Sequence, residues 1–139
     1  MWKFEHSIIT DVSAEKIWKI WSNVEAWNKW DKEVEWAKIQ GDFAVGTIGY
    51  LKPKGAPKSK FVMTGCKKNE SFSDRSFLPL ATLEFFHVMK QTNDGLVVTH
   101  SIKISGLLSW VFAKLIGEKL SKGLPEAMNE LVTLAKQKN

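Results

Sequence analysis

Apolar residues recur every three or four positions in the C-terminal part of the chain, residues 106–138, with lysine and glutamate between them. This spacing is typical of one amphipathic helix, about 45–50 Å in length. Proline removes a hydrogen bond to the preceding helical turn, so we expect a kink at Pro125. The apolar stripe consists of Leu108, Phe112, Ile116, Leu120, Leu124, Met128, Leu131 and Ala135, and it is widened by Leu107, Val111, Leu115 and Val132.

The rest of the chain alternates largely with a period of two, which is typical of half-buried strands. The first strand covers residues 2–10. Ser13 is suited to cap a short helix that begins at Ala14, and a second short helix begins at Asn23. Six further strands follow these helices, at 33–39, 47–54, 59–67, 70–77, 83–92 and 96–104. The last two flank Asn93-Asp94-Gly95, a strong hairpin signal.

This order of elements predicts a single α+β domain over residues 1–139. Sequential antiparallel strands twist and curl, and the long helix is the element large enough to cover the apolar face of such a sheet. We therefore expect a curved antiparallel sheet of about seven strands wrapped around a long kinked C-terminal helix, with two short helices after the first strand. Because a curved sheet rarely closes completely around a helix, we also expect a cavity between them.

Several short motifs accompany this order. Trp27-Asn28-Lys29-Trp30-Asp31 is similar to a W-x-x-W-D motif, and others are Phe4-Glu5-His6, Ile17-Trp18, 41–47, Phe86-His87, Thr99-His100, 106–108 and 123–127. Over essentially its whole length the chain resembles the helix-grip fold of the START-like (SRPBCC) superfamily, in particular its polyketide cyclase/dehydrase-like branch. The resemblance implies a fold more than an activity, since the superfamily includes carriers, cyclases, hormone receptors and chaperone cofactors.

The composition indicates many large side chains and excludes some classes of protein. Seven Trp and eight Phe supply more large side chains than a minimal core needs. Cys66 is the single cysteine, so no intrachain disulfide can form, and we read it as structural. The charged, alternating N-terminus is unlike a signal peptide, and the longest apolar run, 104–116, is too short to span a membrane. We expect a cytoplasmic protein without stable membrane insertion.

The formal net charge is +5, which raises the question of a nucleic-acid partner. Arg75 is the one arginine among twenty basic residues, and arginine is the residue favoured for bidentate contacts to bases and phosphates. We therefore predict no nucleic-acid binding. The excess charge is local, and we interpret it as a solvated hairpin rather than a contact surface for anions. It comprises Lys52, Lys54, Lys58, Lys60, Lys67 and Lys68.

Alternation places all three histidines on the inner face of the sheet. The hairpin puts His87 opposite or diagonal to His100, within about 5–8 Å, and the resemblance places the first strand, with His6, beside the last. Three imidazoles on adjacent strands could bind zinc, but their wide spacing in the sequence is no metal motif. We favour buried histidines that hydrogen-bond within the protein or to a ligand, and we predict no metal and no cofactor.

Two further groups have the character of a binding site. Trp27 and Trp30 are candidates for an aromatic mouth of the cavity. Asp74 and Arg75 lie in mid-strand, where one of the two must face inward, and an inward carboxylate would have a raised pKa and could act as an acid or base. For this pair we favour the alternative of an exposed strand edge or a salt bridge. The predicted ligand-binding residues are His6, Trp27, Trp30, Tyr50, Phe85, His87, Met89, His100, Ile102, Phe112 and Ile116.

The function that these features favour is binding of a small hydrophobic or aromatic ligand, lipid-like or polyketide-like, in the cavity. One alternative is an enzyme resembling the polyketide cyclases and dehydrases, with His87 and His100 as catalytic acid–base groups. Another is an interaction module that presents the lysine hairpin or the tryptophan-rich end to a partner protein. The sequence leaves open the identity of the ligand and the oligomeric state.

Overall fold

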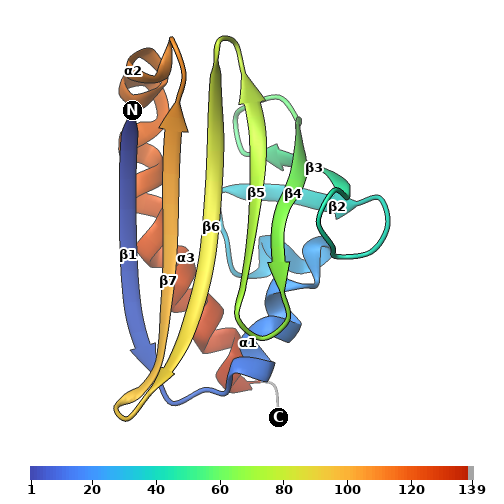
Figure 1. The fold of residues 1–139 in the computed structure, drawn as a ribbon, viewed down its shortest axis with the longest axis vertical. Helices are drawn as coiled ribbons and strands as arrows, with labels where there is room; N and C mark the ends of the chain where they lie inside the picture. Colours follow the sequence, from blue (N-terminus) through green and yellow to red (C-terminus); the bar gives the residue numbers. More distant parts are fainter. Residues whose placement is uncertain (138–139) are drawn as a thin grey trace.

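The computed structural model describes residues 1–137, so Lys138, the last residue of the predicted helix, lies outside it (Figure 1). Within this range the strands are β1 (Trp2–Thr10), β2 (Val34–Ile39), β3 (Ile48–Pro53), β4 (Ser59–Lys67), β5 (Ser71–Leu78), β6 (Ala81–Thr92) and β7 (Gly95–Ser105). The helices are α1 (Ala14–Trp21), the 3-10 helix η1 (Val24–Lys29), α2 (Ser109–Phe112), the π-helical segment η2 (Ala113–Gly117) and α3 (Glu118–Gln137).

The strands form one antiparallel sheet in the order β1-β7-β6-β5-β4-β3-β2. Register shifts between Val34 and Trp36 in β2 and between Met63 and Gly65 in β4 mark irregularities that bend a sheet. The sheet curls so far that β2 and β3 run across the direction of β4 to β6, while α3 lies along its inner face (Figure 1). This is the predicted α+β architecture of seven strands, two short helices and a long C-terminal helix, and the prediction is confirmed.

The long helix contains the π-helical segment η2, and Pro125 lies further along, inside α3. The kink expected at Pro125 stays a prediction. At η2 the helix passes close to β1, since a Cβ added to the buried Gly117 would lie 3.2 Å from two ring atoms of Trp2. A π-helical segment also changes the phase of the side chains. Leu107 and Leu115, predicted to widen the buried stripe, are exposed in consequence of this change and of the late helix start.

The core is densest beneath α1 and the C-terminal half of α3. Trp21, Phe72, Met128 and Leu131 are almost completely buried there. In the N-terminal half of the long helix the predicted stripe is only half-buried, at Leu108, Phe112, Ile116, Leu120 and Leu124. The space between sheet and helix is therefore filled at one end and less so at the other.

Candidate functional site

A cavity of about 450 Å³ occupies the less filled end of this space. Its walls come from η1, β3, the loop 53–58, the inner faces of β5 and β6, and residues 116–124 of the helix. The lining is predominantly apolar, with Trp27, Leu51, Phe61, Leu83 and Phe85 among its members. A volume of this size is within the range of pockets that enclose drug-sized organic molecules.

Charged residues from three segments surround the opening of the cavity. Lys119 from the helix lies 3.2 Å from the carboxylate of Glu33, and both residues contribute to the lining together with Lys54 and Lys58 of the loop. Asp31, the last residue of the W-x-x-W-D motif, also lines the cavity and accepts a hydrogen bond from the backbone N–H of Glu33 at 3.0 Å. Burial raises the pKa of Asp31 despite this hydrogen bond.

Asp74 is the carboxylate in the wall of the cavity formed by the sheet. It is only 6% exposed, and burial raises its pKa from 3.8 to about 7. Within residues 1–137 neither a cation nor a hydrogen-bond donor opposes this shift. Ser76 lies two residues further along β5 and lines the cavity from the same face. The prediction of an exposed edge or salt bridge is wrong for Asp74, whereas Arg75 does point away and lies 3.2 Å from Glu84.

The three histidines occupy one row across the sheet. His6 in β1 is directly opposite His100 in β7, and His100 is directly opposite His87 in β6. His87 lines the cavity, stacks on Phe72 with ring centroids 3.8 Å apart, and has its Nδ1 3.3 Å from the Phe72 carbonyl oxygen. A carbonyl oxygen only accepts hydrogen bonds, so Nδ1 carries the proton and Nε2 keeps its lone pair.

Both buried imidazoles are neutral near pH 7. Burial lowers the pKa of His87 from 6.5 to about 3. Burial, together with repulsion from the charged forms of His87 and His6, also holds the pKa of His100 well below its usual value. His100 is covered by Trp21 and Trp30, whose rings lie 5.8 and 6.0 Å from it, and its Nε2 has no hydrogen-bond partner among the described residues.

A group of three or more His, Cys, Asp or Glu side chains able to hold a metal ion is not present in residues 1–137. The row arrangement explains why the three imidazoles do not converge. Neighbouring strands lie about 4.8 Å apart, so His6 and His87 are separated by roughly twice that distance with His100 between them.

The predicted ligand-binding residues divide into two sets. Six line the cavity, namely Trp27, Trp30, Phe85, His87, Ile102 and Ile116. The other five, His6, Tyr50, Met89, His100 and Phe112, are not part of its lining.

The position of each of these five residues explains why it does not line the cavity. Tyr50 neighbours Leu51 in β3, so it points to the opposite face, where its ring lies 5.5 Å from Lys58 Nζ. Met89 lies beyond His87 on β6 and packs in the dense part of the core. His6 is separated from the cavity by β7, His100 is buried beneath two tryptophans, and Phe112 precedes the turn of helix that reaches the cavity.

Some lining residues were not predicted as site residues. Leu83 shares its strand face with Phe85, and alternation from that neighbour would have placed it, whereas Ser76 shares the face of Phe72 in β5, where Phe77 on the other face makes alternation ambiguous. Lys54 and Lys58 were predicted only as part of a solvated hairpin, and Lys119 only as one of the polar residues between the apolar positions of the long helix. The sequence does not show that these segments meet at the opening of the cavity.

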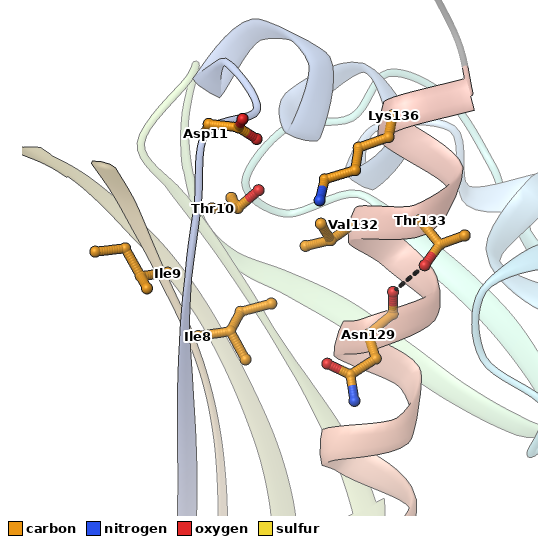
Figure 2. Close-up of a pocket in the computed structure, with 8 residues that line it drawn as sticks. All are labelled: Ile8, Ile9, Thr10, Asp11, Asn129, Val132, Thr133 and Lys136. Carbon is orange, nitrogen blue, oxygen red and sulfur yellow. Dashed lines mark hydrogen bonds between the residues drawn. The ribbon is translucent and has the colours of Figure 1, made fainter. Parts of the chain in front are cut away.

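A second hollow lies between the end of β1 and the last turns of α3 (Figure 2). It is open to solvent, with Asp11, Asn129 and Lys136 at its rim. Thr133 donates a hydrogen bond to the Asn129 carbonyl at 2.9 Å, the dashed line in Figure 2. An open, polar hollow encloses little of a ligand, so the cavity beneath the helix is the better candidate site.

Comparison with known proteins supports the fold. No protein-family model matches the chain. Uncharacterized protein YdcF of Bacillus subtilis is 36% identical over 52 residues, which are 37% of this chain and 54% of that protein. The match thus spans about half the length of this curated relative.

Two solved structures share the architecture over almost the whole chain. The di-domain ARO/CYC StfQ from the steffimycin biosynthetic pathway matches with a TM-score of 0.78 and 12% identity, over 97% of this chain and 50% of that chain. Norcoclaurine synthase from Thalictrum flavum, in complex with dopamine and hydroxybenzaldehyde, matches with a TM-score of 0.74 and 17% identity, over 99% and 88%. These matches confirm, at the level of the fold, the predicted resemblance to START-like helix-grip proteins.

Proposed function

We propose that this protein binds a small hydrophobic or aromatic molecule in the cavity between the sheet and the long helix. The observation that carries the proposal is the unfilled, apolar space of about 450 Å³ next to a core that is otherwise densely packed. A protein interior normally leaves few voids larger than a water molecule, so a space of this size needs a reason. The structurally similar norcoclaurine synthase forms a complex with dopamine and hydroxybenzaldehyde, which are small aromatic molecules, and this agrees with the proposal.

The polar groups of the wall narrow the chemistry of the ligand. His87 presents a lone pair at Nε2, while Asp74 and Ser76 present oxygens without a strong partner on the same wall. Nε2 of His87 is an acceptor, and the oxygens of Asp74 and Ser76 can accept as well, so the wall suits a ligand that carries a hydroxyl or amine on an otherwise apolar body. Such a ligand would orient its donor toward β5 and β6 and its apolar part toward the helix.

The second candidate function is catalysis of proton transfer in the same cavity, as in a cyclase or dehydrase. Asp74 is the observation that favours it, because a carboxyl with a pKa of about 7 can both donate and accept a proton near neutral pH. His87, one of the two predicted catalytic histidines, is neutral there and acts as an acceptor from its lone pair. His100 is buried outside the cavity lining, so in this proposal the acid–base role belongs to Asp74.

A cavity-filling variant tests ligand binding. We expect the neutral dye Nile red to bind saturably at one molecule per chain with roughly micromolar affinity, and flat aromatic or acyl compounds to displace it. Leu83→Trp adds volume inside the cavity and should weaken binding at least about tenfold. Fluorescence titration measures both.

The matched control is Val88→Trp, which adds the same ring to the outer face of the same strand, where Val88 is exposed. This variant should bind the dye like the unmodified protein. Equal loss of binding in the two variants, or absence of saturable binding in the unmodified protein, would contradict the proposed site.

A further inference from the structure

One end of the molecule carries a cluster of exposed apolar side chains close to the cavity. Leu107, Trp110 and Leu115, in or next to α2 and η2, are 77%, 64% and 70% exposed. Phe77 and Leu80, at the turn between β5 and β6, are 63% and 64% exposed. We call these five residues the apolar tip.

The two segments of the apolar tip lie side by side. The backbone N–H of Leu108 donates to the Leu80 carbonyl at 3.0 Å, and a Cβ added to Gly106 would lie 2.8 Å from the Cα of Ala81. Figure 1 shows α2 and the turn between β5 and β6 at the same end of the molecule. In a π-helical segment residues five apart lie about one turn apart, so Leu115 follows Trp110 along one side of the helix.

The backbone of Leu80 is strained in addition to its side chain being exposed. Its φ of 54° lies in the left-handed region, which is uncommon for a residue with a large side chain and costs about 1–3 kcal/mol where it is strained. Since the side chain is exposed, the strain is not repaid by packing within the chain. Soluble proteins seldom keep several large apolar side chains together in water unless the surface meets a partner.

Basic residues outnumber acidic ones around the apolar tip, since Lys3 and Glu84 flank Lys103 in the sheet and Glu118 follows Lys114 by one turn of the helix. Residues 77–82 and 103–117, which form this end, contain Lys103 and Lys114 and no acidic residue. At the opening of the cavity, Lys54 and Lys58 of the loop 53–58 lie beside the Lys119–Glu33 ion pair, so lysine is in excess over glutamate there. Exposed tryptophan and leucine flanked by lysine is the combination that favours the interface of an anionic bilayer.

We propose that the apolar tip docks this protein on the surface of a bilayer that contains anionic lipid, with the opening of the cavity close to the headgroups. Ile116 and Leu120, which line the cavity, continue along the same helix from Leu115. A hydrophobic ligand could then pass between bilayer and cavity with little exposure to water. The docking is peripheral, and none of the helices in residues 1–137 is long and apolar enough to cross a membrane.

A second copy of the chain is the competing occupant of the same surface, and charge argues against it. In a symmetric dimer through the apolar tip, the Lys114 side chains of both copies would approach one another near the interface, since Lys114 lies between Trp110 and Leu115. Anionic headgroups neutralise the same lysines instead. The observations therefore favour lipid.

Vesicle sedimentation tests the proposal. The protein should bind vesicles of phosphatidylcholine with 30% phosphatidylglycerol about tenfold more tightly than pure phosphatidylcholine, and salt should weaken this binding. The double variant Leu107→Glu/Trp110→Glu should lose at least about tenfold in binding. The matched control is Ile9→Glu/Val88→Glu, which makes the same change of charge at two exposed apolar residues away from the apolar tip and should lose much less.

Fluorescence quenching tests the docking without a variant that removes the apolar surface. Trp110 is the exposed one among seven tryptophans, so brominated phosphatidylcholine mixed into the anionic vesicles should quench part of the emission. Trp110→Phe keeps an apolar side chain, so it should keep vesicle binding and lose that quenching.

Three results would overturn the proposal. The first is absence of binding to the anionic vesicles. The second is an equal loss of binding in the apolar-tip and control variants. The third is a dimer in analytical ultracentrifugation that the apolar-tip variant dissociates while neither form binds vesicles, which would assign the surface to a second copy. None of these readouts depends on a ligand in the cavity, so failure of the docking and failure of the ligand-binding proposal are distinguishable.

Discussion

Replacing Asp74 by asparagine is expected to stabilise the folded protein by about 4 kcal/mol at pH 8. Asparagine has nearly the shape of a protonated carboxyl and no charge to desolvate. The folded-state pKa of Asp74 is about 7 and its unfolded value is 3.8, so above pH 7 the folded state holds a carboxylate that water would solvate better. Chemical denaturation at a series of pH values measures this gain.

The pH dependence of the gain identifies its cause. Between pH 3.8 and 7 the folded state keeps a proton that the unfolded chain releases, so the cost of Asp74 grows with rising pH through this window. The advantage of Asp74→Asn should therefore disappear below about pH 4. Glu84→Gln, which removes the partner of Arg75 on the opposite face, is the control and should not stabilise. An equal gain at pH 4 and pH 8 would contradict the assignment.

A residue that weakens the fold is retained when it serves another purpose, and this makes Asp74 informative about function. If the cavity only holds an apolar body, Asp74→Asn should keep Nile red binding. If the protein transfers protons, the same variant should bind substrate and lose turnover. The two functions are thus separated by a variant that is expected to fold better than the unmodified protein.

Much of the fold could be predicted because two signals in the sequence agreed with each other. Alternation and the Asn93-Asp94-Gly95 turn set the pairing of β6 with β7, and this pairing places His87 directly opposite His100. The position of His6 opposite His100 rested on the resemblance, and the structure agrees. Local patterns of this kind can be read from the sequence because each strand has one buried face.

The candidate site was less predictable because its local signals conflict. In β5, Phe72 and Phe77 have opposite parity, so hydrophobicity alone does not show which face is inner. The structure buries Phe72 and exposes Phe77, which turns Asp74 inward and Arg75 outward. A single residue of difference in parity thus decides whether the cavity contains a carboxylate or a guanidinium.

The long helix shows a second limit of prediction from the sequence. Its heptad-like stripe extends from Leu108 to Ala135 in the sequence, but the π-helical segment shifts the phase before Glu118. Pro125 is the irregularity visible in the sequence, whereas η2 lies where Gly117 comes close to Trp2, a contact between distant parts of the chain. Tertiary contacts of this kind leave no periodic signal.

Acidification from pH 6.5 to 4 is expected to lower the contribution of the two buried histidines to the free energy of unfolding, at a rate of about 1.4 kcal/mol per pH unit for each proton that only the unfolded chain binds. Unfolded histidines take up protons below about pH 6.5, while His87 does not do so in the folded state until about pH 3 and His100 resists as well. Each therefore binds one more proton in the unfolded chain, and stability rises with pH through this window. Asp74 and Asp31, whose pKa values burial raises, contribute the opposite sign.

Two variants separate these contributions. His100→Phe removes one histidine and a buried nitrogen without a partner, so the free energy of unfolding should fall less steeply on acidification from pH 6.5 to 4 than in the unmodified protein. Asp74→Asn removes an opposing group, so its slope should be steeper by about 1.4 kcal/mol per pH unit than that of the unmodified protein. Urea denaturation across this range measures both slopes. An unchanged slope in His100→Phe would mean that His100 titrates as in water, and the close row of buried imidazoles behind the cavity would then be open to solvent.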